Sequence, residues 1–174
     1  YVCWRIWLEP RLWVLVVSGE ASRAEQFSSA VAGHLQQIPW LKHLAPPNAS
    51  KSFTVQGVTK GEWPTLTSRT SRGNLRGPRA DLVILDDPIG TRDKESQAVR
   101  AKVNNALHEI PLILNPAGRF FKQKGLTVPV YAQTRCLALY TPTDRQPNDF
   151  YQQSKETDNF WNRFEVHRYP AVVD

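Results

Sequence analysis

The fold class is decided by one stretch of the chain, residues 79–88, which reads RADLVILDDP. Four consecutive aliphatic residues, Leu82 to Leu85, make a strand that is apolar on both faces. This pattern is typical of a strand inside a parallel sheet that has helices on both sides. Such a strand needs no acid, so the carboxylates of Asp86 and Asp87 at its C-terminal end require an explanation. In open α/β sheets, ligands bind beyond the carboxyl ends of the strands.

Two interpretations of the acidic pair are open. The first is a Walker B motif, because the strand-end aspartate of P-loop NTPases helps to hold the Mg²⁺ ion that is bound to nucleotide phosphates. The second is a simple strand exit, in which aspartate and the following Pro88 serve a turn. These ten residues alone do not decide between the two.

Composition sets broad limits on the protein. The 174 residues are 41% hydrophobic and 22% charged, which is enough for one globular core. The formal charge of +6 and the sequence pI of about 9.5 favour an anionic partner. Cys3 and Cys136 show no spacing pattern, so neither a disulfide framework nor a zinc site is indicated, and a reducing intracellular compartment fits. No apolar run reaches the roughly 18 residues that a membrane span needs.

The first part of the chain predicts a helix end, a strand and a second helix. Residues 1–8 are apolar and rich in tryptophan, as in a helix that stops before Pro10. With no methionine anywhere, we expect this sequence to be a piece of a longer protein. Residues 12–17 form a second apolar strand that ends at Ser18, and a helix is predicted over 21–37. One apolar stripe runs along that helix, formed by Ala24, Phe27, Val31, Leu35 and Ile38.

The segment 40–79 carries a weaker signal and a cluster of arginines. Residues 52–58 alternate enough for a short strand. Glycines and a proline among the arginines predict a loop, which either faces phosphates, since it leads into the strand that bears the aspartates, or is a solvated basic loop. The arginines are Arg69, Arg72, Arg76 and Arg79.

Beyond the acidic pair, a helix is predicted over 93–110 and is closed by Pro111. The stretch 115–134 is irregular and interleaves aromatic with cationic residues. Such a mixture can bind nucleic acid, and it also occurs in a surface hairpin with a hydrophobic underside. A third apolar strand follows at 136–140.

The last residues predict a short helix over 148–155 and a strand over 164–167. The three apolar strands end in Ser18, in Asp86-Asp87 and in Thr141-Pro142-Thr143. In a parallel sheet these ends share one edge, which favours a nucleotide site over a strand exit. A phosphate loop, G-x-x-x-x-G-K-[ST], is absent from the sequence. We therefore expect residues 1–174 alone not to hydrolyse ATP.

The sequences of five segments, and their order along the chain, resemble those of the large subunit of tailed-phage terminases, the DNA-packaging motors, especially the terminases of short-tailed phages. Each segment is short, and the five in this order are fairly specific. They are VLVVSGEASRAEQF at 14–27, IPWLKHL at 38–44, GNLRGPRADLVILDDP at 73–88, ALYTPT at 138–143 and RYP at 168–170.

The resemblance implies a P-loop ATPase domain of the ASCE (RecA-like) type, an α/β fold with a mostly parallel sheet. Residues 1–174 would be a partial domain, with the Walker A loop upstream of Tyr1 and a metal-dependent nuclease domain after Asp174. By similarity, Asp86 is the Mg²⁺ ligand and Asp87 is the catalytic carboxylate that polarises the attacking water.

Further roles follow from the same resemblance. Thr141 and Thr143 match the coupling motif at the nucleotide site. Arg79 is favoured, over Arg72 and Arg76, to act on the γ-phosphate of a neighbouring subunit, although it could instead anchor its strand by pairing with Asp81. The implied cofactors are ATP and Mg²⁺. The implied partners are double-stranded phage DNA, the portal or procapsid, the small terminase subunit and further copies in a ring, all in the cytoplasm of a bacterial host and without a membrane.

The chain departs from the family pattern at the acidic pair. Many members carry Asp-Glu where this chain has Asp-Asp, so Asp87 is one methylene shorter and has to sit closer to the water or act through another group. The alternative function is a catalytically inactive basic module for DNA binding or assembly, such as a degenerate prophage remnant.

Overall fold

The computed structural model describes seven stretches of the chain, all within the compact unit Tyr1–Thr143. In the last three stretches it describes the backbone and, of the side chains, that of Leu137. The expected helix at 148–155 and strand at 164–167 lie outside the described residues. The described ranges are 1–58, 63–77, 79–90, 96–115, 120–123, 126–129 and 135–139.

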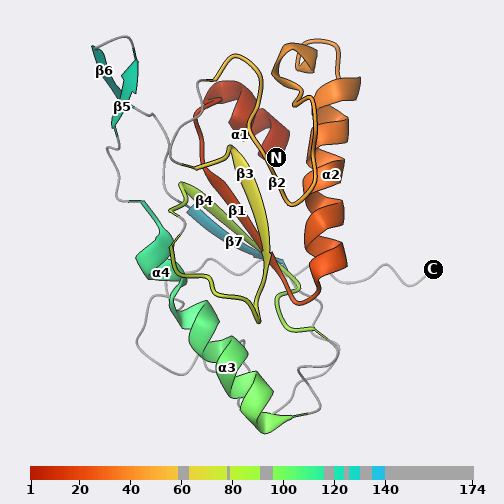
Figure 1. Cartoon of the computed structure of the whole chain (residues 1–174), viewed down its shortest axis with the longest axis vertical. Coiled ribbons are helices and arrows are strands. Elements are labelled where there is room, and N and C mark those ends of the chain that lie inside the picture. Colours follow the sequence, from red (N-terminus) through yellow and green to blue (C-terminus); the bar gives the residue numbers. More distant parts are fainter. Residues whose placement is uncertain are drawn as a thin grey trace, which may run out of the picture. The chain divides into compact units, whose positions relative to one another are not determined.

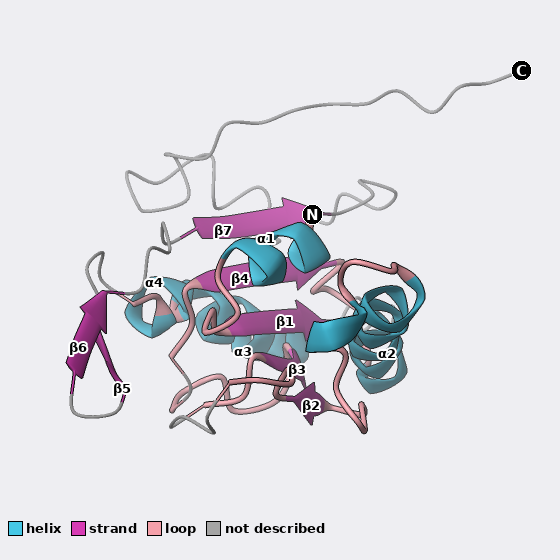
Figure 2. Ribbon diagram, turned by 90° about the horizontal axis from the view of Figure 1, so that it is seen from above, coloured by secondary structure: helices cyan, strands magenta, loops and turns pink. Residues whose placement is uncertain are grey.

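The centre of the fold is a five-stranded mixed sheet (Figures 1 and 2). Parallel pairing joins β1 to both β3 and β4, and β4 to β7, whereas β2 is antiparallel to β3. The predicted α/β class is confirmed. In sheet order the strands are β2 (Ser52–Phe53), β3 (Leu66–Thr70), β1 (Val14–Ser18), β4 (Leu82–Asp86) and β7 (Arg135–Leu139).

Helices cover both faces of this sheet, with α1 in front of the strands and α3 behind them in Figure 2. A short 3-10 turn, η1 (Lys42–Leu44), follows α2, and β5 (Phe120–Gln123) pairs with β6 (Leu126–Pro129) in a separate hairpin. Among the described helices, none is long and apolar enough to cross a membrane. The helices are α1 (Val2–Leu8), α2 (Ala21–Gln37), α3 (Gln97–His108) and α4 (Ile110–Ile113).

The hydrophobic core explains why the apolar strands lie in the middle of the sheet. Alternate residues of β1 and β4, such as Val16 and Ile84, join one buried cluster with Val31 and Leu35 of α2. Their sequence neighbours on the strands are buried as well and point to the opposite face of the sheet. A strand buried on both faces needs the unbroken aliphatic run from which the fold class was predicted.

Most predicted elements are confirmed, with small changes in their bounds. The helix end at the start of the chain is α1, the strand at 12–17 is β1, and the helix at 21–37 is α2. The strand at 136–140 is β7. The hairpin predicted in the second interpretation of the stretch after 115 is confirmed by β5 and β6, whereas its hydrophobic underside and a nucleic-acid contact stay predictions.

Three predictions about element boundaries were wrong, in whole or in part. Pro111 does not close the helix before it, because that helix ends at His108 and Pro111 lies in the first turn of α4, where its missing N–H costs nothing. The loop predicted around the arginines is confirmed for Arg72, Arg76 and Arg79 but not for Arg69, which lies in β3. The short strand predicted at 52–58 is reduced to the two residues of β2.

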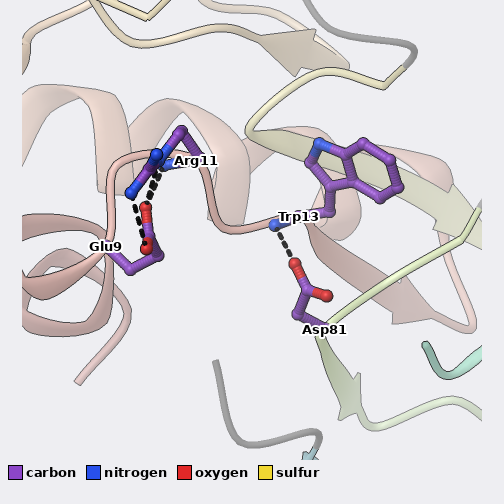
Figure 3. Close-up of polar contacts among 4 residues, drawn as sticks. All are labelled: Glu9, Arg11, Trp13 and Asp81. Atoms are coloured by element: carbon purple, nitrogen blue, oxygen red, sulfur yellow. Dashed lines mark hydrogen bonds and ion pairs between the residues drawn. The ribbon is translucent and has the colours of Figure 1, made fainter. Parts of the chain in front are cut away.

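A buried carboxylate, Asp81, ties together the entrances of β1 and β4 (Figure 3). Its Oδ2 accepts the backbone N–H of Trp13 at 2.9 Å, and its Oδ1 accepts the side-chain amide of Asn115 at 2.8 Å. The turn before β1 is held by a second acid, Glu9, which Arg11 contacts through two guanidinium nitrogens. These contacts fix the register of the two strands at the edge where they begin.

We expect Asp81→Ala to lower the free energy of unfolding by about 3 kcal/mol, because two donors lose a charged acceptor in a site that is only 2% exposed. Chemical denaturation followed by circular dichroism measures this change. Glu20→Ala, which removes an exposed carboxylate, is the control and should change stability by less than about 0.5 kcal/mol. Equal stability of the two variants would contradict the structural role of Asp81.

Candidate functional site

The candidate site lies at the edge of the sheet where the parallel strands end. In the strand register, Ser18 of β1 is level with Thr70 of β3 on one side and with Asp86 of β4 on the other. Figure 1 shows these three ends close to the start of α2. The predicted convergence of a hydroxyl and the carboxylates at one edge is therefore confirmed for Ser18 and Asp86, whereas Thr141 and Thr143 lie outside the described residues.

The backbone at Asp87 turns the chain sharply at this edge. Asp87 has a φ of 45°, in the left-handed region that aspartate tolerates better than most residues because its short side chain bonds locally. Its carbonyl accepts the N–H of Gly19 at 3.0 Å, which ties the turn after β4 to the turn after β1. These contacts show a strand exit at the acidic pair, and they are compatible with the interpretation of the pair as a ligand site.

Arg23, in the first turn of α2, faces the acidic pair. Its Nη1 lies 3.1 Å from Oδ2 of Asp87, and both side chains are partly exposed. Asp86 borders an open depression on the protein surface. The other residues that line this depression are Arg23, Gln26, Phe27 and Ala30, all from α2.

The surroundings of Asp86 disfavour its ionised form. Partial burial and the neighbouring charge of Asp87 raise the pKa of Asp86 above its ordinary value of 3.8, and the charge of Arg23 offsets part of this rise. A pKa that is higher in the fold than in the unfolded chain means that the fold prefers the protonated acid. The contribution of Asp86 to stability is therefore most favourable below pH 3.8, and it is lost as the pH rises through the pKa of Asp86 in the folded protein.

The donor set fits a magnesium ion that brings its own phosphate ligands. Within the described ranges, no three His, Cys, Asp or Glu side chains gather closely enough to hold a metal by themselves. Mg²⁺ needs only one or two carboxylates when substrate phosphates and waters complete its octahedron. A cation beside Asp86 would also relieve the repulsion that raises the pKa of its carboxyl.

Arg76 and Arg79 lie away from this edge. They precede β4, so they belong to the edge where the strand begins, and the strand separates them from Asp86. Arg76 pairs with Glu109 at 2.6 Å, and Arg79 donates to the carbonyl of Leu112 at 2.6 Å. Arg79 thus hydrogen-bonds to the end of the α3–α4 segment, whereas Asp81 accepts hydrogen bonds from Trp13 and Asn115.

Sequence reasoning missed Gly19 and Arg23 as parts of the site. A Cβ on Gly19 would lie 2.3 Å from the backbone nitrogen of Gly90, so only glycine allows the turns after β1 and β4 to touch. A usable signal was present for both, because Ser18-Gly19 follows an apolar strand and Arg23 lies in the first turn of the next helix. The carboxyl ends of parallel strands and the helix starts beside them share one edge.

This arrangement, an α/β sheet with a carboxylate pair beyond its parallel strands, is compatible with a nucleotide-binding protein. No protein-family model matches the chain. The chain is similar to the large subunit of the terminase of Enterobacteria phage T3, with 29% identity over 120 residues, which are 67% of this chain and 20% of that protein. The resemblance to terminase large subunits that the sequence predicted is confirmed, and the match spans about a fifth of the length of that relative.

Proposed function

We propose that this chain is part of the ATPase of a phage DNA-packaging motor, in which ATP hydrolysis drives double-stranded DNA into a procapsid. The observation that carries the proposal is the position of Asp86 and Asp87 beyond a buried parallel strand, in a chain similar to a terminase large subunit. The basic charge of +6 suits a protein that works on a polyanion. The proposed partners are the portal or procapsid, the small terminase subunit and further copies of the same protein in a ring.

Each acid has a distinct role in this proposal. Asp86 would hold Mg²⁺, and the ion would supply positive charge beside the nucleotide phosphates. Asp87 accepts a hydrogen bond from the attacking water and aligns it, and the ion pair with Arg23 at 3.1 Å orients this carboxylate before substrate arrives. Thr141 and Thr143 are proposed to contact the nucleotide and to couple its hydrolysis to movement on DNA.

We expect Asp86→Asn to stabilise the metal-free chain at pH 7 and to remove its response to magnesium. The fold disfavours the ionised form of Asp86, so a neutral amide relieves this cost. In the wild type, Mg²⁺ should raise the free energy of unfolding by about 2.7 kcal/mol at a concentration 100 times its Kd. Thermal unfolding with increasing MgCl₂, at a fixed concentration of inorganic tripolyphosphate that supplies the phosphate ligands, measures both effects.

The matched control is Glu109→Gln, which also removes one carboxylate but lies beside Arg76. This variant should keep the magnesium response of the wild type. A wild type that shows no stabilisation by Mg²⁺, or an Asp86→Asn variant that responds as the wild type does, would contradict the proposed metal site.

A catalytically inactive module that binds DNA is the second candidate, and the net charge of +6 favours it equally. Such a module would bind duplex DNA with an affinity that falls steeply as salt rises, and it would be indifferent to Mg²⁺ at Asp86. The magnesium response therefore separates the two candidates.

A further inference from the structure

The strand β3, which was not predicted from the sequence, determines the edge of the sheet at which Arg72 lies. Because β3 runs parallel to β1, the residues after Thr70 emerge at the same edge as Asp86. The backbone N–H of Ser71 donates to the carbonyl of Ser18 at 2.9 Å, which ties this segment to the end of β1. Gly73 closes a tight turn by donating to the carbonyl of Thr70 at 3.0 Å, and Arg72 is exposed within that turn.

The contacts of the neighbouring arginines show where each of them lies. The guanidinium of Arg69 donates to the carbonyl of Asn74 at 2.5 Å, within the same loop. Arg76 and Arg79 contact the α3–α4 segment, as described above. Of the four arginines in the basic segment, Arg72 alone follows a strand end at the edge that carries the acidic pair.

Two buried hydroxyls flank the turn without a described partner. Ser18 and Ser71 are both 0% exposed, and no described group exchanges a hydrogen bond with either Oγ. Buried hydroxyls in native proteins are nearly always paired, and Ser28 and the indole of Trp63 share this unpaired state. These two hydroxyls are an observation independent of the arginine, and they belong to the same two strand ends.

We propose that Arg72 binds the phosphate groups of the nucleotide at Asp86 of its own chain. The inference rests on the proposed function and names the cation that faces the phosphates in cis. The carboxyl of Asp86 takes the metal, and the guanidinium, two strands away across β1, takes phosphate oxygens through paired hydrogen bonds. Arg79, at the opposite edge of the sheet, could then serve only a neighbouring subunit.

The test follows ¹⁵N-labelled wild-type chain by NMR while Mg²⁺ and inorganic tripolyphosphate are added together. The amide signals of Gly19, Ser71 and Gly73 should shift, because these residues form the strand ends around Arg72. Arg72→Ala should raise the apparent Kd about tenfold, the effect of losing a strong charge-assisted contact. Arg76→Ala is the matched control, since it removes the same charge from the same segment at the other edge, and it should stay within twofold of the wild type.

A second titration replaces tripolyphosphate with a short DNA duplex, whose phosphates offer the same chemistry. If Arg72→Ala weakens duplex binding and leaves tripolyphosphate binding unchanged, the arginine faces DNA and the inference is overturned. Equal effects of Arg72→Ala and Arg76→Ala on tripolyphosphate would overturn it as well, because they would indicate a general loss of positive charge.

Asp86→Asn distinguishes failure of the inference from failure of the proposed function. If Asp86→Asn abolishes magnesium-dependent binding but Arg72→Ala does not weaken it, the proposed function stands and the inference fails. If tripolyphosphate binds wild-type protein and Asp86→Asn equally, with or without Mg²⁺, the proposed function fails and the inference falls with it.

Discussion

Replacing Asp87 with asparagine is expected to lower ATP turnover by about 10²–10⁴-fold in any longer protein that carries this chain together with a phosphate-binding loop. The amide keeps the shape of the side chain but is a much poorer acceptor for the proton of the attacking water. Nucleotide binding should remain, because Mg²⁺ is assigned to Asp86. Steady-state hydrolysis and binding of a fluorescent nucleotide, measured on the same preparation, give the two quantities.

The contrast with the neighbouring acid makes this prediction specific. Asp86→Ala should weaken the binding of magnesium and nucleotide, whereas Asp87→Asn should leave it intact. Loss of the ion pair with Arg23 should change stability little, because both partners are partly exposed. Turnover at the wild-type rate in Asp87→Asn would remove this residue from catalysis.

The sequence was sufficient for the parts of the fold that local patterns determine. A continuous aliphatic run predicted β4 and a second one predicted β1, because a strand buried on both faces cannot alternate. The stripe at spacings of three and four predicted α2 with its observed bounds, Ala21–Gln37. The position of Asp86 at the edge where the parallel strands end followed from the polarity of parallel strands alone.

The strand β3 was missed because its stability comes from distant residues. Its sequence LTSRT contains one large aliphatic residue, Leu66, and its ladder partners in β1 lie about fifty positions earlier in the chain. Polar residues such as Ser68 are buried there by pairing and not by their own hydrophobicity. Because the strand was missed, the positions of Arg72 and Arg79 at opposite edges could not be predicted.

The last prediction concerns the contact that holds the two turns of the site together. We expect Gly19→Ala to lower the free energy of unfolding by about 3 kcal/mol and to abolish the magnesium response of the chain. The new Cβ would lie 2.3 Å from the nitrogen and 2.6 Å from the Cα of Gly90. Both atoms belong to the backbone, so no side chain can rotate away and the turns must separate.

Separation of the turns should affect function as well as stability, because the N–H of Gly19 donates to the carbonyl of Asp87. Gly33→Ala is the control for the substitution itself. Gly33 lies within α2 with no atom within 4 Å of an added Cβ, so alanine there should raise the free energy of unfolding by up to about 1 kcal/mol. Thermal unfolding and magnesium titration of both variants measure these effects. Wild-type stability and a wild-type magnesium response in Gly19→Ala would show that the two turns do not need their close contact.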